Sequence, residues 1–249
     1  MDEHRNLIFD LYGTLYDIHT NERRLSFWRQ FAEYLKGYGM DYHPGQLQKK
    51  YLRSCRQETE RMRKERGFEL IEISIDTVFR QLCQDQGYEP DKHDIEMIAR
   101  TFRSLSTDYL KLYPQVRETL SRLKGQGRRL FILSNAQQLF TDYEMEELNI
   151  REYFEGIFYS SACGCRKPSG RFYDCLFSRH GLKKQESVMI GNDYYSDILS
   201  AHDYGIASIY IQTNQSWKHH GPLPDDCRQI QKIGDILKLQ QDWPTAERD

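Results

Sequence analysis

Residues 6–17 read NLIFDLYGTLYD, a short apolar run that ends at an aspartate and is followed by a glycine and a threonine. An apolar run of this length beside a turn signal predicts a buried β-strand. Asp10 then lies at the C-terminal tip of that strand. Ligands of parallel α/β sheets bind outside the carboxyl ends of the strands. The stretch therefore predicts both the first strand of the fold and a candidate functional carboxylate.

Four further apolar runs follow, and segments with helical spacing separate them. Strand–helix alternation of this kind favours an α/β fold with a Rossmann-like parallel sheet that helices cover on both faces. An amphipathic pattern from Ile230 to Leu239 predicts a last helix that closes the sheet. The runs expected to be strands cover 130–133, 156–159, 188–190 and 207–211, and the helices between them 116–126, 137–148, 169–180 and 197–204.

Residues 20–110 break this alternation. We find no convincing strand there, and apolar residues at helical spacing predict four helices, near 25–38, 44–65, 70–86 and 91–106. We interpret the segment as a helical cap domain inserted directly after the first strand. The expected core domain then consists of residues 1–19 and 111–249, and the cap of residues 20–110.

The composition argues against several classes of protein. The 249 residues carry 35 Lys and Arg against 37 Asp and Glu, which disfavours a dedicated nucleic-acid or membrane-surface binder. Aromatic residues reach 13%, too many for a disordered chain. No apolar run approaches the ~18 residues of a membrane span. The six cysteines without a CxxC pair, and an N-terminus unlike a secretory signal, lead us to expect a cytoplasmic protein. We expect a monomer or a homodimer, between which the sequence does not decide.

Polar residues follow the expected strands in an order that resembles the haloacid dehalogenase (HAD) superfamily, subfamily I with a C1 helical cap. The resemblance extends from residue 6 to about residue 212, and it implies a hydrolase. The matching motifs are FDLYGT at 9–14, of the DxYGT type, Ser134–Asn135, Lys167–Pro168 and GNDYYSDI at 191–198.

The resemblance implies a catalytic set at the strand tips. Asp10 would act as the nucleophile, because a carboxylate can attack phosphorus and form a covalent intermediate. Thr14 would orient Asp10, and Lys167 would neutralise it and the phosphoryl oxygens. Ser134, with Asn135 beside it, would hydrogen-bond those oxygens.

A magnesium ion would shield the two anions that meet in phosphoryl transfer, and Mg²⁺ prefers oxygen ligands. The expected function is thus Mg²⁺-dependent hydrolysis of a small anionic phosphorylated metabolite through an aspartyl-phosphate on Asp10. The expected ligands are Asp10, the backbone carbonyl of Tyr12, Asn192, Asp193 and Asp197.

Tyr12 departs from the pattern of the family's phosphatases, which carry a second aspartate at this position as the general acid and base. A phenol, with a pKa near 10, can donate a proton but is a poor base at neutral pH. Candidates for handling the leaving group are Tyr12 itself, Asp17 and His19, the last two on the segment that leads into the cap.

Two alternatives stay open. L-2-haloacid dehalogenases of the superfamily also carry DxYGT, need no metal, and use a cap arginine for the halide, for which Arg29 is a candidate. Tyr173 also matches a position used in those enzymes. Retention of both Asp193 and Asp197 favours the phosphatase. The second alternative is a catalytically weak protein of this fold that binds a phosphorylated ligand.

Overall fold

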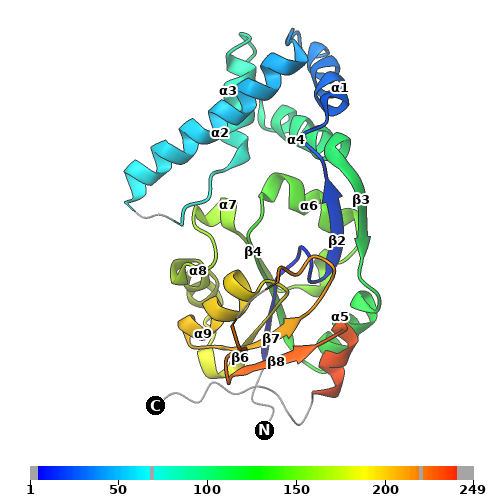
Figure 1. Cartoon of the computed structure of the whole chain (residues 1–249), viewed down its shortest axis with the longest axis vertical. Coiled ribbons are helices and arrows are strands. Elements are labelled where there is room, and N and C mark those ends of the chain that lie inside the picture. The colour runs from blue at the N-terminus through cyan, green and yellow to red at the C-terminus, as the bar shows by residue number, and fades with distance from the viewer. Residues whose placement is uncertain (1–4, 68–69, 219–220, 240–249) are drawn as a thin grey trace.

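The computed structural model describes residues 5–67, 70–218 and 221–239. Six strands form one parallel sheet in the order β5-β4-β1-β6-β7-β8, with β1 near its centre (Figure 1). This confirms the α/β fold. The strands are β1 (Asn6–Phe9), β4 (Arg129–Ser134), β5 (Gly156–Tyr159), β6 (Ser187–Gly191), β7 (Ala207–Ile211) and β8 (Cys227–Ile230).

Both faces of the sheet are buried. Successive strand side chains point to opposite faces, so Leu7 and Phe9 join one apolar cluster while Ile8 joins another. Helix α5 (Val116–Gly125) contributes to the first cluster, and α8 (Gly170–His180) to the second. The remaining core helices are α6 (Gln138–Glu147), α7 (Ser160–Cys163), α9 (Ser200–Tyr204) and the 3₁₀ helices Arg151–Tyr153, Lys184–Glu186 and Ile233–Lys238.

Two expectations about the C-terminal part need correction. Ile230 ends strand β8, and the amphipathic pattern after it forms the 3₁₀ helix Ile233–Lys238 rather than an α-helix from Ile230 to Leu239. The helix expected over 197–204 begins earlier, as a π-helix over Tyr194–Leu199 that continues into α9. Asp193 fixes this start, because its carboxylate accepts hydrogen bonds from the first turn.

A two-stranded antiparallel ribbon carries the chain from the sheet to the cap helices and back (Figure 1). Its strands are β2 (Tyr16–Thr20) and β3 (Thr107–Leu112). The expectation that no strand lies within residues 20–110 is therefore wrong at both limits of that range, because β2 ends at Thr20 and β3 begins at Thr107. The sequence of β3 lacks a regular apolar alternation because none of its six residues is buried.

Four helices form the cap, as predicted: α1 (Leu25–Lys36), α2 (Pro44–Arg66), α3 (Ile75–Gln84) and α4 (Lys92–Ser106). The third begins at Ile75 rather than near residue 70. Ile71 instead forms an antiparallel bridge with Cys165 in the core. The Arg166 N–H donates to the Leu70 carbonyl at 3.1 Å, and the Glu72 N–H donates to the Gly164 carbonyl at 3.3 Å.

An aromatic cluster fills the cap, and it includes Phe31 and Phe102 together with Phe140 from α6 of the core. The rings of Phe102 and Phe140 are stacked, 5.9 Å apart. The cap and the core therefore share one apolar cluster.

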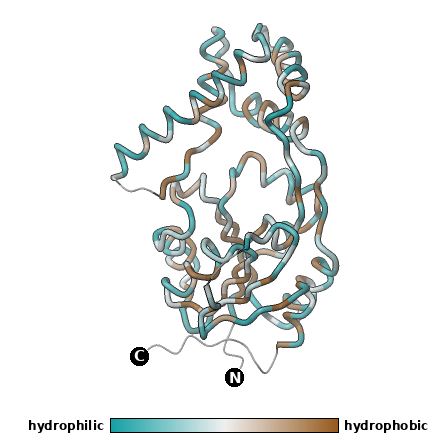
Figure 2. The backbone as a smooth tube through the Cα atoms, viewed as in Figure 1, coloured by the Kyte–Doolittle hydropathy of each residue, from teal (hydrophilic) through white to brown (hydrophobic). Residues whose placement is uncertain are grey.

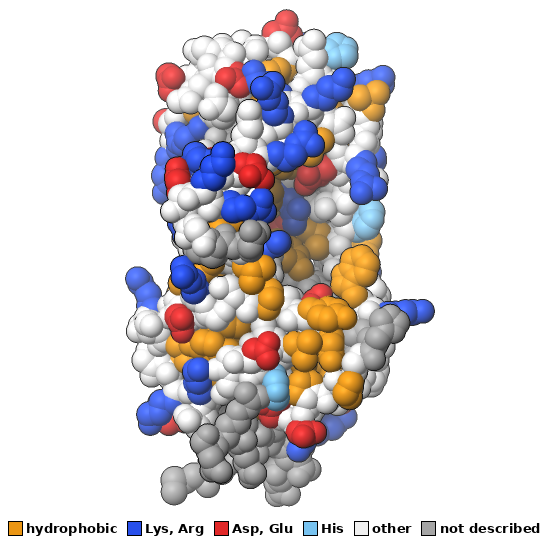
Figure 3. Space-filling view, turned by 60° about the vertical axis from the view of Figure 1, so that its left-hand side comes forward, with side chains coloured by type: hydrophobic (Ala, Val, Ile, Leu, Met, Phe, Trp, Pro, Cys, Tyr) orange, Lys and Arg blue, Asp and Glu red, His pale blue; other side chains and the backbone are white. Residues whose placement is uncertain are grey.

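Helix α2 is predominantly hydrophilic (Figure 2). Figure 3 shows the side of the molecule on which α2 lies, and Lys and Arg side chains gather there over the cap. Arg61 pairs with Glu58 and Glu65, and Arg63 with Glu60, along the same helix. Such pairs are typical of a solvated helix surface. No helix of the described residues is long and apolar enough to cross a membrane.

Candidate active site

Asp10 follows β1 directly, and side chains from three other segments reach its carboxylate. Lys167 Nζ lies 2.9 Å and Ser134 Oγ 3.0 Å from Oδ1, while Thr14 Oγ1 lies 3.4 Å from Oδ2. The Asp10 N–H donates to the carbonyl of Ile190 on β6 at 2.9 Å, which extends the sheet ladder to this position. The parallel sheet thus brings together residues that lie 124 and 157 positions from Asp10 in the chain.

Lys167 is almost fully buried and binds two carboxylates at once. Its ammonium also donates to Asp197 Oδ1 at 2.6 Å. Burial alone lowers the pKa of Lys167, but the charges of Asp10 and Asp197 more than offset this and raise the pKa above its ordinary value. Asn135 holds the lysine's backbone: its Oδ1 accepts from the Lys167 N–H at 2.8 Å, and its Nδ2 donates to the Lys167 carbonyl at 3.1 Å.

The site has an excess of buried negative charge. Two carboxylates, Asp10 and Asp197, face the single ammonium of Lys167. Burial raises the pKa of Asp197, the Lys167 ammonium acts against this, and the Asp10 carboxylate adds to it. An unbalanced buried charge is costly unless a proton or a cation neutralises it. Either a proton on Asp197 or a bound cation would therefore offset the second carboxylate.

The loops that follow β1 and β6 meet beside Asp10. Asn192 Oδ1 accepts a hydrogen bond from Thr14 Oγ1 at 3.0 Å. Gly13 adopts φ +76°, and a Cβ there would lie 2.4 Å from the amide nitrogen of Asn192. Only glycine tolerates both the left-handed conformation and this approach. Gly13 thus allows the loop to approach Asn192, and Thr14 makes the hydrogen bond to it.

The predicted metal ligands are placed differently from one another. Asp197 uses Oδ1 for Lys167 and Oδ2 for the Asp193 N–H at 2.9 Å, so both of its oxygens are engaged within the protein. Asp193 Oδ1 accepts from the N–H groups of Tyr195 and Ser196 at 2.9 and 2.7 Å. In the structure Asp197 is thus a partner of Lys167, and its role as a metal ligand stays a prediction.

The oxygen donors at this edge of the sheet suit magnesium. In the described ranges no group of three or more His, Cys, Asp or Glu side chains gathers to hold a metal ion. Mg²⁺ does not need such a cage, since it is usually held by one or two carboxylates and keeps several waters. Asp10, Asn192 and Asp193 are oxygen donors on adjacent strand tips, β1 and β6, and the excess negative charge described above fits a divalent cation.

Tyr12 directs its hydroxyl to α6 rather than to Asp10. The hydroxyl lies 2.8 Å from Thr141 Oγ1 and donates to Glu144 Oε2 at 2.7 Å, an oxygen that also accepts from the Tyr16 hydroxyl at 3.0 Å. Burial, followed by the nearby Glu144 carboxylate, raises the pKa of Tyr12 above its ordinary value. The phenol is therefore engaged as a donor to Glu144, which disfavours it as an acid for a leaving group.

Arg103 on α4 completes this network, and sequence reasoning missed it. Its Nε donates to Glu144 Oε1 at 2.5 Å, and its Nη2 lies 3.4 Å from the Tyr12 hydroxyl oxygen. Arg103 and Glu144 lie 41 residues apart in the chain. Both are on helices, so the search for polar residues at strand ends could not find them. Only the packing of α4 on α6 brings them together.

Asp17 lies at the beginning of the ribbon and is buried. Its carboxylate accepts hydrogen bonds from Gln215 Nε2 at 2.6 Å and from Asn214 Nδ2 and the Tyr109 hydroxyl, both at 3.2 Å. Burial acts to raise the pKa of Asp17, but these hydrogen bonds and the nearby Lys111 outweigh it and hold the pKa below its usual range. Asp17 therefore stays ionised and anchors the ribbon to the loop after β7.

Two other candidates lie on the outside of the cap and ribbon. The His19 side chain is 56% exposed and lies 2.7 Å from Asp108 across the ribbon. Arg29, the candidate for halide binding, is exposed on α1. Tyr173 is fully buried and hydrogen-bonds to Ser200 at 2.7 Å, as expected of a packed core tyrosine. None of the three has a hydrogen bond to Asp10.

A cavity of about 360 Å³ lies between the cap and the core, next to the residues that follow Asp10 and Ser134. The surface is hollowed between cap and core in Figure 3. The core contributes Tyr12, Asn135, Ala136, Gln137 and Phe140 to the lining, and the segments of the insertion contribute Glu22, Tyr51, Cys55, Glu72, Ile73, Ile75 and Arg103.

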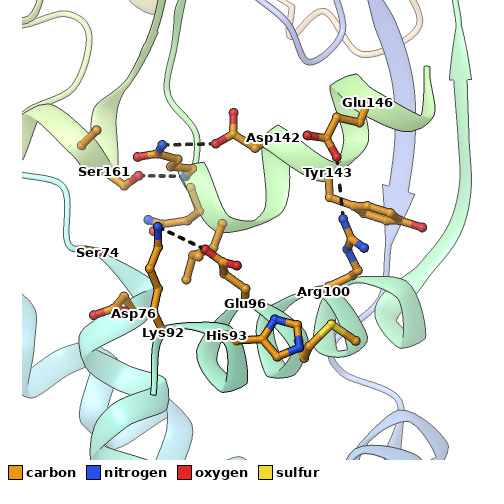
Figure 4. A pocket seen from close by; sticks show the side chains of 15 residues that line it. Ser74, Asp76, Lys92, His93, Glu96, Arg100, Asp142, Tyr143, Glu146 and Ser161 are labelled. Atoms are coloured by element: carbon orange, nitrogen blue, oxygen red, sulfur yellow. Dashed lines mark hydrogen bonds and ion pairs between the residues drawn. The ribbon is translucent and has the colours of Figure 1, made fainter. Parts of the chain in front are cut away.

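A second cavity, of about 610 Å³, lies between α4 and α6 (Figure 4). Lys92 pairs with Glu96 at 3.6 Å and Arg100 with Glu146 at 3.7 Å across its lining, while Asp76 and Asp142 pair with Arg80 and Arg151 outside it. None of the predicted site residues lines it, so we place the candidate chemistry in the first cavity.

The parallel sheet, the inserted helices and the polar strand tips define a class of α/β hydrolases. The chain belongs to the haloacid dehalogenase-like hydrolases, whose family pattern matches residues 7–211. A glyceraldehyde 3-phosphate phosphatase of Methanothermobacter thermautotrophicus is 24% identical over 190 residues, which cover 70% of this chain and 84% of the relative. An (S)-2-haloacid dehalogenase of Pseudomonas sp. (strain YL) is 26% identical over 232 residues, 90% of each chain.

The solved structure of a HAD phosphatase from Thermococcus onnurineus has the same fold, with a TM-score of 0.61 at 15% identity over 97% of this chain and 100% of that one. The relatives include enzymes of both chemistries. The geometry of the site must therefore decide between them.

Proposed function

We propose that this hydrolase is a Mg²⁺-dependent phosphomonoesterase that acts on a small phosphorylated metabolite through an aspartyl-phosphate on Asp10. The observation that carries the proposal is the excess buried negative charge of Asp10 and Asp197 around Lys167. A divalent cation can balance this charge and can also shield the anionic phosphoryl group of the substrate. A metal-free attack on the carbon of an anionic haloacid would have to proceed against it.

Magnesium, when bound by Asp10, the Tyr12 backbone carbonyl, Asn192 and Asp193, supplies positive charge to the phosphoryl oxygens. Lys167 and Ser134 contribute an ammonium and a hydroxyl, both of which contact Asp10 Oδ1. The Thr14 hydroxyl contacts both Asp10 Oδ2 and Asn192 Oδ1 and so fixes their relative positions. These contacts fix the nucleophile before substrate arrives, which is the main protein contribution to phosphoryl transfer.

In the proposed reaction an Asp10 oxygen attacks phosphorus while the bond from phosphorus to the leaving-group oxygen breaks. The leaving alkoxide takes up a proton from water, since the Tyr12 hydroxyl donates to Glu144. A second water then attacks phosphorus, releases inorganic phosphate and restores the Asp10 carboxylate. We therefore expect turnover to depend strongly on the pKa of the leaving group.

Two observations disfavour the dehalogenase alternative. Arg29 is exposed on α1, and Arg103, the arginine that does line the cavity, already pairs with Glu144 at 2.5 Å. Arg29 does not line the cavity, and the charge of Arg103 is already balanced by Glu144.

The test is p-nitrophenyl phosphate turnover with Mg²⁺ and with EDTA, beside chloride release from 2-chloropropionate. We expect Mg²⁺-dependent turnover that Asp10→Asn abolishes, because the amide is a poor nucleophile. Asp203→Asn, an exposed aspartate on α9, is the matched control and should keep wild-type turnover. Halide release without metal would establish the dehalogenase instead, and the absence of both activities would leave a ligand-binding protein.

A further inference from the structure

The cavity between cap and core lies next to the proposed catalytic site, although Asp10 is not among its lining residues. Tyr12 and Asn135, which line it, lie two residues after Asp10 and one after Ser134. Asn135 also holds the backbone of Lys167. A phosphoryl group at Asp10 would therefore project its leaving group into this cavity. A volume of about 360 Å³ limits that group to a small molecule.

Acidic side chains outnumber basic ones in the lining of the cavity. Glu22 and Glu72 line it, beside the single cation Arg103. The charge of Arg103 is already taken up by Glu144, which contacts its Nε at 2.5 Å. The cavity therefore presents two carboxylates to a ligand and no cation that lacks a protein partner.

Glu22 has unused hydrogen-bonding capacity. Its carboxylate makes no hydrogen bond or ion pair to any part of the chain that the structure describes, and only the more distant charge of Arg103 acts on it. Glu72 accepts from Gln137 Nε2 at 3.1 Å and lies 3.4 Å from Ser160 Oγ. Burial raises the pKa of both groups, although the charge of Arg103 acts against this at Glu22 and the charge of Arg166 does so at Glu72.

We propose, on the basis of the proposed function, that Glu22 and Glu72 select phosphomonoesters whose leaving group carries hydroxyl or ammonium donors and no carboxylate. Carboxylates accept hydrogen bonds from such groups. A leaving group with its own carboxylate would meet like charge in a partly buried cavity, where the repulsion is stronger than in water. The same pair disfavours 2-haloacids, which must carry a carboxylate.

The test compares three phosphomonoesters of nearly equal size in the presence of Mg²⁺: 2-hydroxyethyl phosphate, phosphoethanolamine and 2-phosphoglycolate. We expect kcat/KM for the first two to exceed that for 2-phosphoglycolate roughly tenfold, from like-charge repulsion at an intermediate dielectric. Equal values, or a preference for 2-phosphoglycolate, would overturn the proposal.

Glu22→Gln and Glu72→Gln remove one charge each and keep the shape of the side chain. Each should reduce the preference against 2-phosphoglycolate several-fold. Glu33→Gln, an exposed glutamate on α1, is the control and should leave the preference unchanged. A preference that none of the variants alters would show that the two carboxylates do not cause it.

Turnover of p-nitrophenyl phosphate separates this inference from the proposed function. If the wild type hydrolyses that compound but prefers 2-phosphoglycolate, the selectivity proposal fails and the phosphatase stands. If no phosphomonoester is hydrolysed, the phosphatase fails, and the rise in melting temperature caused by each of the three compounds tests the selectivity of the cavity by itself. A ranking with 2-phosphoglycolate first would then contradict the proposal.

Discussion

Tyr12 occupies the position where a catalytic acid is expected in phosphatases of this family, but its hydroxyl serves another purpose. It shares Glu144 with Tyr16 and Arg103, and all four side chains are at least half-buried. A buried polar group that is fully hydrogen-bonded stabilises its surroundings, and its loss leaves partners unsatisfied. We infer that the phenol acts on the position of the loop after β1.

Tyr12→Phe tests this inference. Without the hydroxyl, Glu144 loses one donor, and we expect the free energy of unfolding to fall by about 1–2 kcal/mol in urea denaturation. Turnover of p-nitrophenyl phosphate should change less than about threefold, because the phenol is not the acid. A loss of 10²-fold or more, the usual effect of removing a general acid, would restore Tyr12 as a catalytic residue.

The sequence predicted the residues at the strand tips and not their partners. Asp10, Ser134 and Asn192 lie at the ends of three of the apolar runs, and parallel strands place such ends at one edge of a sheet. The partners of Tyr12 come from α4 and α6, whose sequences indicate only a helix with an apolar face. Contacts between the polar residues of two helices depend on their crossing, which residue spacing does not determine.

The β2–β3 ribbon is the element that joins the cap to the sheet, and the loop after β7 holds it in place. Gln215 and Asn214 bind Asp17, and Thr213 Oγ1 donates to the Gly13 carbonyl at 2.8 Å. One short loop therefore contacts both the ribbon and the turn beside the proposed nucleophile.

Asp17→Asn should weaken this attachment in a pH-dependent way. Since the folded pKa of Asp17 is lowered, its contribution to stability is present above the unfolded pKa, near 3.9, and is lost as the pH falls through the folded value. We expect the variant to lose about 1–3 kcal/mol of unfolding free energy at pH 7, and the difference from wild type to shrink toward pH 3. Urea denaturation across this range measures it, with Asp203→Asn as the control. A difference that stays constant with pH would show that the charge of Asp17 is not involved.

Elements were predictable where an apolar pattern marked them. The five longer apolar runs became strands, and the four cap helices followed their helical spacing. The ribbon and β8 were missed because most of their residues are polar or exposed. The π-helix begins at Tyr194 because Asp193 caps it, a contact within a loop that also contains a candidate metal ligand.

At the scale of the whole molecule, several polar contacts join the cap and the core besides the ribbon. The backbone of Leu70–Glu72 pairs with the loop that precedes Lys167. Gln137 donates to Glu72 and to the Ile73 carbonyl and accepts from the Ile75 N–H. Arg103 and Glu144 form a buried ion pair between α4 and α6. The cap therefore contacts core residues close to the proposed active site.

Arg103→Met should be the most costly single change at this junction. It leaves Glu144, which is 2% exposed, without its cation, and breaking a buried pair in this way costs about 3–5 kcal/mol. We expect Arg103→Met/Glu144→Gln to be more stable than Arg103→Met alone, since the double variant removes the stranded charge. Urea denaturation of both single variants, the double variant and the wild type gives the coupling energy. Additive losses would mean that the pair does not join cap and core.

The shared aromatic cluster has a consequence for protein engineering. Phe140 belongs to a core helix, but its ring packs on Phe102 among the aromatic side chains of the cap. A chimaera that takes residues 20–110 from a relative would set a foreign surface against this phenylalanine, and a deletion of the insertion would expose it to water. Exchange of substrate preference between relatives of this fold therefore requires that the residue facing the cap on α6 be transferred together with the insertion.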